Sequence, residues 1–88
     1  MPNPPKYSVG VPLPCTLRHQ METQLGDDFS DVRIYHDHGA TLLGVNAYTE
    51  GSEIHFAPGF YNPHTSTGRE LIAHELAHVI QQREGQDD

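Results

Sequence analysis

A chain of 88 residues with a single cysteine, Cys15, can fold in only a few ways. A chain this short forms one hydrophobic core at most and buries a modest fraction of its surface, so its stability is expected to be marginal. Domains of this size commonly gain stability from a disulfide, a metal or a partner, and one cysteine cannot form an internal disulfide. The sequence therefore predicts a single domain that depends on a metal ion or on a partner.

Charge and hydropathy narrow the class of partner. Twelve acidic residues against five Lys and Arg give a formal net charge of -7, which disfavours binding to nucleic acid or to anionic lipid. No apolar run approaches the length of a membrane span, and residues 1–6 lack the apolar stretch of a secretory signal. We therefore expect no nucleic-acid partner, no membrane insertion, and synthesis in the cytoplasm. Export by a machine that does not read a signal peptide stays open.

Prolines divide the chain into an arm and a core. Residues 1–14 hold five of the seven prolines, a spacing that forbids a helix and suits an extended, polyproline-like arm. We place the core domain at residues 15–85 and a short acidic tail at residues 86–88. Within the core, Leu17 and Met21 begin an apolar stripe that recurs every four residues and predicts a short helix ended by Gly26.

The middle of the core is predicted to form a small sheet. Apolar and polar residues alternate with a period of two in the first strand, and a glycine turn joins the other two strands as a hairpin. His55 alternates with Ile54 and Phe56, so it faces away from their side of the sheet, toward either solvent or the helix. The predicted strands cover residues 31–36, 46–49 and 53–57, with a short helix or loop ending at Gly44.

Residues 67–82 are predicted to form the C-terminal helix. Thr67 and Glu70, three residues apart, fit a capping box in which each side chain satisfies a backbone N–H of the first turn. Gly85 is a suitable end. The residues spaced to form one apolar, core-facing stripe are Ile72, Leu76, Val79 and Ile80.

The motif His74-Glu75-x-x-His78 places three chemically active side chains on this helix. Residues four apart project from the same face, so both imidazoles can reach one zinc ion at about 2.0 to 2.1 Å. Glu75 lies roughly 100° round the helix from His74. This offset keeps its carboxylate out of the first coordination shell but near enough to act as the general base toward water. The spacing is that of the H-E-x-x-H metallopeptidases and predicts Zn²⁺ as the cofactor.

The third ligand of this zinc is not evident from the sequence. A catalytic zinc normally has three protein ligands and one open position for water. No histidine follows His78, so the ligand comes from upstream, comes from another chain, or is missing. We take His36 as the third ligand, and we consider Cys15 an inhibitory ligand whose thiolate would displace the water. The other upstream candidates are His38 and His55, whereas His19 and His64 are expected on the surface.

Three alternatives to a peptidase remain open. His74 and His78 can be ordinary helix-surface histidines and Glu75 a solvated carboxylate, because so short a motif also arises by chance. The zinc can be structural, in a domain that serves as an adaptor or loading module, which predicts four protein ligands and no open position. The domain can also be an interaction module without a metal.

A series of short motifs runs along the chain in a fixed order. They are Leu13-Pro14 with Leu17-Arg18, Gly26-Asp27-Asp28-Phe29-Ser30-Asp31-Val32-Arg33-Ile34, Asn46-Ala47-Tyr48-Thr49 with Gly51, Ile54-His55-Phe56-Ala57-Pro58-Gly59 with Tyr61, Gly68-Arg69-Glu70-Leu71, and His74-Glu75-Leu76-Ala77-His78-Val79-Ile80-Gln81-Gln82. This series, from about Leu13 to Gln82, resembles the core domain of bacterial extracellular contractile injection systems, a family regarded as metallopeptidase-like.

The resemblance implies a bacterial protein linked to secreted toxins or injected cargo, with His74, His78 and Glu75 at the family's metal and catalytic positions. We therefore predict a small zincin-like α+β domain with a short N-terminal helix, a small three-stranded sheet and a C-terminal H-E-x-x-H helix. The predicted activity is zinc-dependent hydrolysis of peptide bonds in a protein or peptide substrate. Components of a contractile injection system are predicted partners, and such a system is a possible route of export from the bacterial cytoplasm.

Overall fold

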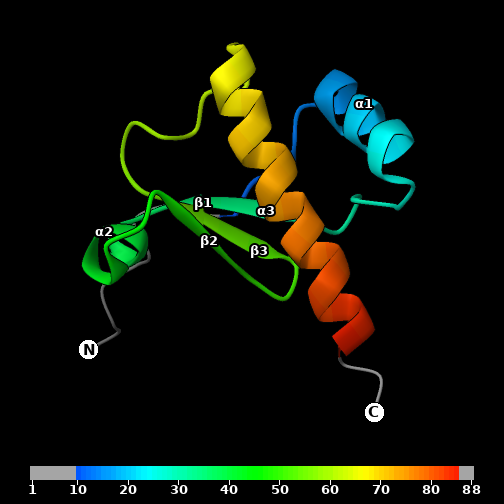
Figure 1. The fold of residues 1–88 in the computed structure, drawn as a ribbon. Coiled ribbons are helices and arrows are strands. Elements are labelled where there is room, and N and C mark those ends of the chain that lie inside the picture. The colour runs from blue at the N-terminus through cyan, green and yellow to red at the C-terminus, as the bar shows by residue number, and fades with distance from the viewer. Residues whose placement is uncertain (1–9, 86–88) are drawn as a thin grey trace, which may run out of the picture.

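The computed structural model describes residues 10–85, in which three helices and three strands form the α+β domain predicted from the sequence. The predictions for residues 1–9 of the arm and for the tail at 86–88 lie outside the described residues. None of the described helices is long and apolar enough to cross a membrane. The elements in chain order are α1 (Cys15–Leu25), β1 (Arg33–His36), α2 (Gly39–Leu43), β2 (Ala47–Glu50), β3 (Glu53–Phe56) and α3 (Ser66–Gly85), as labelled in Figure 1.

The three strands form one mixed sheet in the order β1-β3-β2. β3 pairs parallel with β1 and antiparallel with β2, and the predicted hairpin is confirmed. Gly51 forms its turn at a φ of 62°, a left-handed conformation that glycine adopts without steric cost. The parallel pairing places β3 at the centre of the sheet, so β1 and β2 are its two edges.

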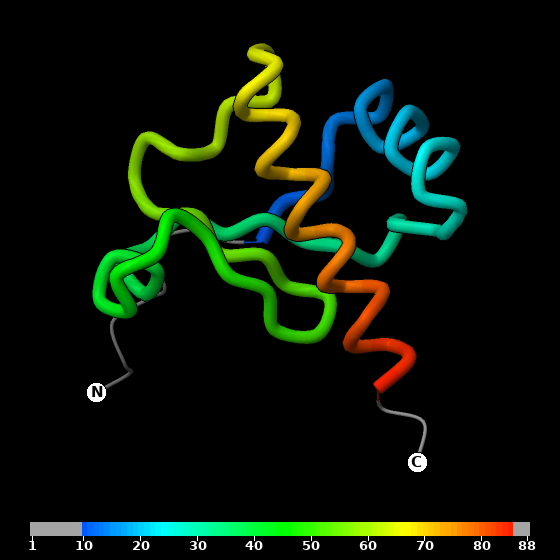
Figure 2. Tube along the Cα trace, viewed as in Figure 1, coloured from blue at the N-terminus to red at the C-terminus, as the bar shows by residue number. Residues whose placement is uncertain are grey.

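The edge at β1 is partly covered by the end of the predicted arm. Val11 and Ile34 form an antiparallel bridge, with Val11 N donating to Ile34 O at 3.0 Å and Ile34 N donating to Val11 O at 2.7 Å. Leu13 is buried in the core, and the trace in Figure 2 climbs from this bridge into α1. The described part of the arm is therefore joined to the domain, and β2 is the sheet edge without a neighbouring strand among residues 10–85.

Helices α1 and α3 pack on one face of the sheet (Figure 1). Their apolar residues meet the strand residues that alternate toward that face, which follows from the helical and strand periodicities read in the sequence. Burying an aliphatic side chain such as Ile72 or Leu76 stabilises the fold by about 1.5–3 kcal/mol. The residues buried in this core are Leu13, Leu17, Met21, Phe29, Val32, Ile34, Ile54, Phe56, Ile72, Leu76 and Val79.

The predicted capping box of Thr67 and Glu70 is wrong. Helix α3 begins at Ser66, and the Oγ1 of Thr65 accepts the backbone N–H of Gly68 at 3.0 Å. Thr65 is therefore the N-cap, and the position three residues later holds a glycine instead of a glutamate. This glycine is required by packing, because a Cβ atom there would overlap the carbonyl oxygen of Asn62 in the preceding loop.

Candidate functional site

His74 and His78 converge on the outer side of α3. Their Nε2 atoms lie 3.2 Å apart, and their rings meet edge to face at 84°. Two nitrogen ligands on a tetrahedral zinc, each about 2.0–2.1 Å from the ion, lie about 3.3 Å from one another, so the observed separation fits a shared cation. Both side chains remain accessible, since His74 is exposed and His78 is half-buried.

Gln81 fixes the tautomer of His78. Its Oε1 lies 3.0 Å from His78 Nδ1, and because an amide oxygen only accepts, the Nδ1 must carry the proton. The neutral ring then has its lone pair on Nε2, the atom that faces His74. Metal-binding histidines commonly have their second nitrogen held in this way. Gln81 was not given this role from the sequence, although its spacing of three residues from His78 places it on the same side of the helix.

Glu75 is buried beside the edge strand, with 4% of its surface exposed. The hydroxyl of Thr49 in β2 lies 2.8 Å from its Oε1 and 3.1 Å from its backbone oxygen, and donates to this pair of acceptors. Among residues 10–85, Glu75 forms no ion pair with a basic side chain. A buried carboxylate without a cationic partner is costly, and a cation bound next to it would offset part of that cost.

Gln82 pairs with the backbone of the open edge. Its Nε2 donates to Thr49 O at 3.0 Å, and its Oε1 accepts the N–H of Gly51 at 2.6 Å. The N–H of Ala57 donates to Asn46 O, which makes these two a hydrogen-bonded pair of the antiparallel ladder. Because such pairs alternate along the ladder, Ala47 and Thr49 direct their N–H and C=O groups away from β3.

The edge next to Glu75 is thus only partly occupied. Gln82 takes the outward carbonyl of Thr49, whereas the outward N–H and C=O of Ala47 have no backbone partner in the described range. An extended peptide can pair with such groups as an additional strand. Thr49 and Gln82 were not singled out from the sequence, because their contacts join residues 26 and 33 positions apart.

Within the described part of the chain, no third ligand lies at His74 and His78. His36 is exposed after β1 and packs edge-on to Tyr61, with 5.1 Å between the ring centres. Cys15 is exposed at the start of α1. Within residues 10–85, neither joins the two histidines in a cluster of three ligand atoms that all lie within 4.8 Å of one another. The roles assigned to His36 and Cys15 therefore stay predictions.

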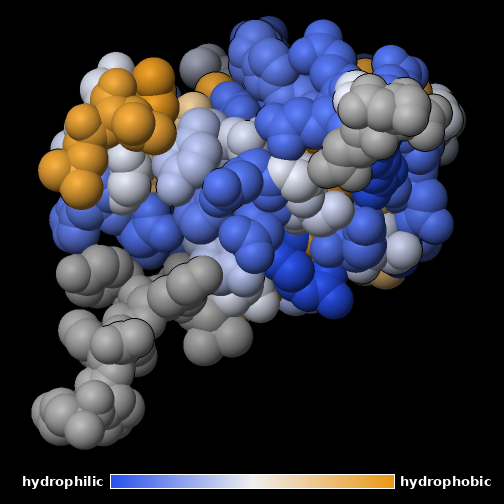
Figure 3. Space-filling view, turned by 90° about the horizontal axis from the view of Figure 1, so that it is seen from below, coloured by the Kyte–Doolittle hydropathy of each residue, from blue (hydrophilic) through white to orange (hydrophobic). Residues whose placement is uncertain are grey.

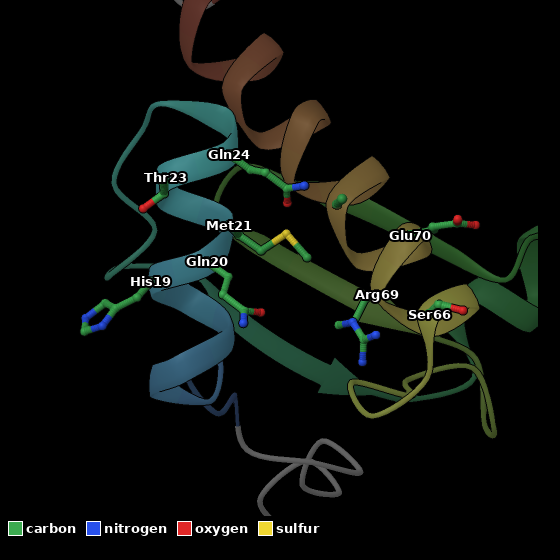
Figure 4. Close-up of a pocket in the computed structure, with 9 residues that line it drawn as sticks. His19, Gln20, Met21, Thr23, Gln24, Ser66, Arg69 and Glu70 are labelled. Carbon is green, nitrogen blue, oxygen red and sulfur yellow. The ribbon is translucent and has the colours of Figure 1, made fainter.

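A groove lies on another flank of α3. A hollow of about 690 Å³ separates α1 from the N-terminal half of α3 (Figure 4). Gln20, Met21 and Gln24 project into it from α1, whereas His19 and Thr23 point away. None of the three motif residues lines this hollow, so it is not part of the candidate catalytic site.

Comparison with known proteins identifies one match. Residues 12–86 match the family described as the eCIS core domain. No curated protein and no solved structure matches the chain.

Proposed function

Because this chain belongs to the eCIS core family, which associates it with bacterial contractile injection systems, we propose that α3 carries a zinc-dependent peptide-hydrolysing site. The observation that carries the proposal is the convergence of His74 Nε2 and His78 Nε2 at 3.2 Å beside the buried Glu75. These two nitrogens would hold the zinc ion. A partner, a substrate or His36 after rearrangement would have to supply the next ligand.

Each protein group has a separate task in this proposal. A zinc ion bound here would supply Lewis-acid chemistry, which polarises a scissile carbonyl and makes water acidic enough to be deprotonated near neutral pH. Glu75 accepts the proton of the attacking water and passes it to the leaving amine. Thr49 holds the Glu75 carboxylate in place through its hydroxyl. The outward backbone groups of Ala47 bind an extended substrate along β2.

Substitution of the proposed general base tests the activity. Glu75→Gln is expected to retain zinc and to lower turnover of an unstructured protein substrate such as casein by about 10²–10⁴-fold. Glu70→Gln is the matched control, because Glu70 is an exposed glutamate on the same helix and its loss changes the charge equally. Equal turnover of wild type and Glu75→Gln, with zinc present in both, would rule out this role.

An adaptor function is favoured by a different observation. Leu42 and Leu43 of α2 are 85% and 65% exposed, and Val45 just after the helix is 42% exposed. Figure 3 shows the resulting apolar group at the α2 end of a largely hydrophilic surface. Exposed apolar groups of this kind commonly mark protein-binding sites. If the domain only docks onto an injection apparatus, substitution of Leu42 and Leu43 by Ser should abolish recruitment, whereas Glu75→Gln should leave it unchanged.

A further inference from the structure

A second cluster of metal-ligand side chains lies on the other face of the sheet, away from α3. Tyr35, His55 and Tyr48 occupy neighbouring positions on the three strands and stack as a row of rings. The His55 ring lies 4.9 Å from that of Tyr35 and 4.7 Å from that of Tyr48, with interplanar angles of 13° and 5°. His55 is 5% exposed. The two tyrosines therefore fix the plane in which both imidazole nitrogens point.

Both nitrogens of His55 face carboxylates. Nδ1 lies 2.9 Å from Asp37 Oδ2, and Nε2 lies 3.3 Å from Glu53 Oε1. A neutral imidazole has one N–H, and the shorter contact places it on Nδ1. The lone pair of Nε2 would then face a carboxylate oxygen. That arrangement is repulsive unless a positive charge, either a second proton or a metal cation, lies between the two atoms.

Glu50 adds a third ligand atom. It is the cross-strand partner of Glu53, and one oxygen of each glutamate and a nitrogen of His55 all lie within 4.8 Å of one another. Like charges directly opposite in a sheet destabilise it. No Lys or Arg of the described segment forms an ion pair with either glutamate. Arg33, the neighbour of Glu53 on β1, instead donates to the carbonyls of Ser30 and Val32.

Three carboxylates lie around the His55 ring. Asp37 contacts Nδ1, Glu53 contacts Nε2, and Glu50 lies opposite Glu53 on the neighbouring strand. The cluster therefore combines a rigid imidazole, two facing glutamates and an excess of negative charge. A carboxylate on the far nitrogen of the histidine is the usual outer partner of a metal-binding imidazole.

We propose that His55 Nε2, Glu53 and Glu50 bind one divalent transition-metal cation, with Asp37 holding the imidazole through Nδ1. The nitrogen ligand favours ions such as Mn²⁺, Co²⁺ or Zn²⁺ over Mg²⁺ and Ca²⁺, which prefer oxygen ligands only. Such an ion would connect β2 to β3 and, through Asp37 directly after β1, to the third strand. This site is separate from the one on α3 and does not depend on hydrolysis.

Co²⁺ titration of the full chain tests the proposal, because the visible absorption of the ion changes when protein ligands replace water in its coordination shell. The site on α3 is first removed by His74→Ala with His78→Ala. This variant is expected to bind one equivalent of Co²⁺, and addition of Glu50→Gln and Glu53→Gln should weaken binding by at least about tenfold. Glu70→Gln with Glu84→Gln makes an equal charge change at exposed positions and should leave binding unchanged. Undiminished binding in the Glu50 and Glu53 variant, or none before those changes, would overturn the proposal.

A measurement on wild-type protein covers the case in which the histidine variants do not fold. Long-range ¹H–¹⁵N NMR with one and two equivalents of Zn²⁺ should show His55 with a proton on Nδ1 and none on Nε2, together with a metal-induced shift of Nε2. Two protons on the His55 ring at both ratios would show that a proton, not a metal, bridges it to Glu53, and would refute the site. Because signals of His74 and His78 are observed separately, failure of one site is distinguishable from failure of the other.

Discussion

Replacement of Thr49 by Val isolates the contact that holds the proposed general base. The change removes a hydroxyl 2.8 Å from Glu75 Oε1 while keeping the shape of the side chain and its preference for a strand. Hydrogen bonds to charged groups contribute about 1.5–3 kcal/mol, and Glu75 is too buried for water to replace the donor freely. We expect a loss of about 2 kcal/mol in the free energy of unfolding. For a domain of this size that loss lowers Tm by about 8–16 °C.

Circular dichroism during urea and thermal unfolding, with chelator present, measures the effect without a contribution from bound metal. Thr23→Val is the control, because Thr23 is exposed on α1. In a Glu75→Gln background the acceptor is neutral, so Thr49→Val should cost only about 1 kcal/mol there. Either of two results would refute the assignment of this hydrogen bond. One is a free energy of unfolding of Thr49→Val within about 0.5 kcal/mol of that of the control. The other is an equal cost of Thr49→Val in the wild-type and Glu75→Gln backgrounds.

Three further predictions concern the fold around the site. Gly68→Ala should lower the free energy of unfolding by about 1–3 kcal/mol in urea titrations, because the added Cβ overlaps the Asn62 carbonyl oxygen. Gln82→Ala should cost about 1–2 kcal/mol and speed amide exchange along β2, because two hydrogen bonds to that edge are lost. The Ser30 backbone N–H, followed by its side chain, lowers the pKa of Asp28 from the ordinary value of 3.8. A carboxylate whose pKa is lower in the folded state stabilises the fold at pH values above its unfolded-state pKa. This stabilisation is lost as pH falls through its folded-state pKa. Asp28→Asn should therefore lower Tm at pH 6 and have little effect near pH 2.

Local patterns in the sequence were sufficient to predict the elements of the fold. The stripe begun by Leu17 and Met21 predicted α1, and alternation around Ile34 predicted β1; the structure confirms both. The N-cap of α3 was missed because Thr65 and Thr67 are equally good caps by residue type. Tertiary packing decides which threonine caps the helix. The loop at Asn62 lies against the first turn of α3, and only a glycine fits at that contact. With Gly68 there, Thr65 is the N-cap.

The residues around the motif were harder to predict, because their roles depend on long-range contacts. Alternation correctly placed His55 on the face opposite Ile54 and Phe56. It could not show that the histidine is buried there between Tyr35 and Tyr48, because that stack depends on the order and register of three strands. A parallel pairing of β1 with β3 leaves no local signal in the sequence, since the two strands are joined through α2 and β2.

The core stripe of α3 explains how the motif divides between buried and exposed groups. The buried face of the helix is centred on the mean direction of Ile72, Leu76 and Val79. Glu75 projects at roughly 60° from this direction. His74 and His78 project at roughly 120–170° from it. The carboxylate is therefore carried down beside β2, while both imidazoles stay on the solvent side. A third ligand cannot come through the buried face of the helix. It has to approach from the solvent side, where a partner or a substrate has access to both imidazoles and to the open edge of β2.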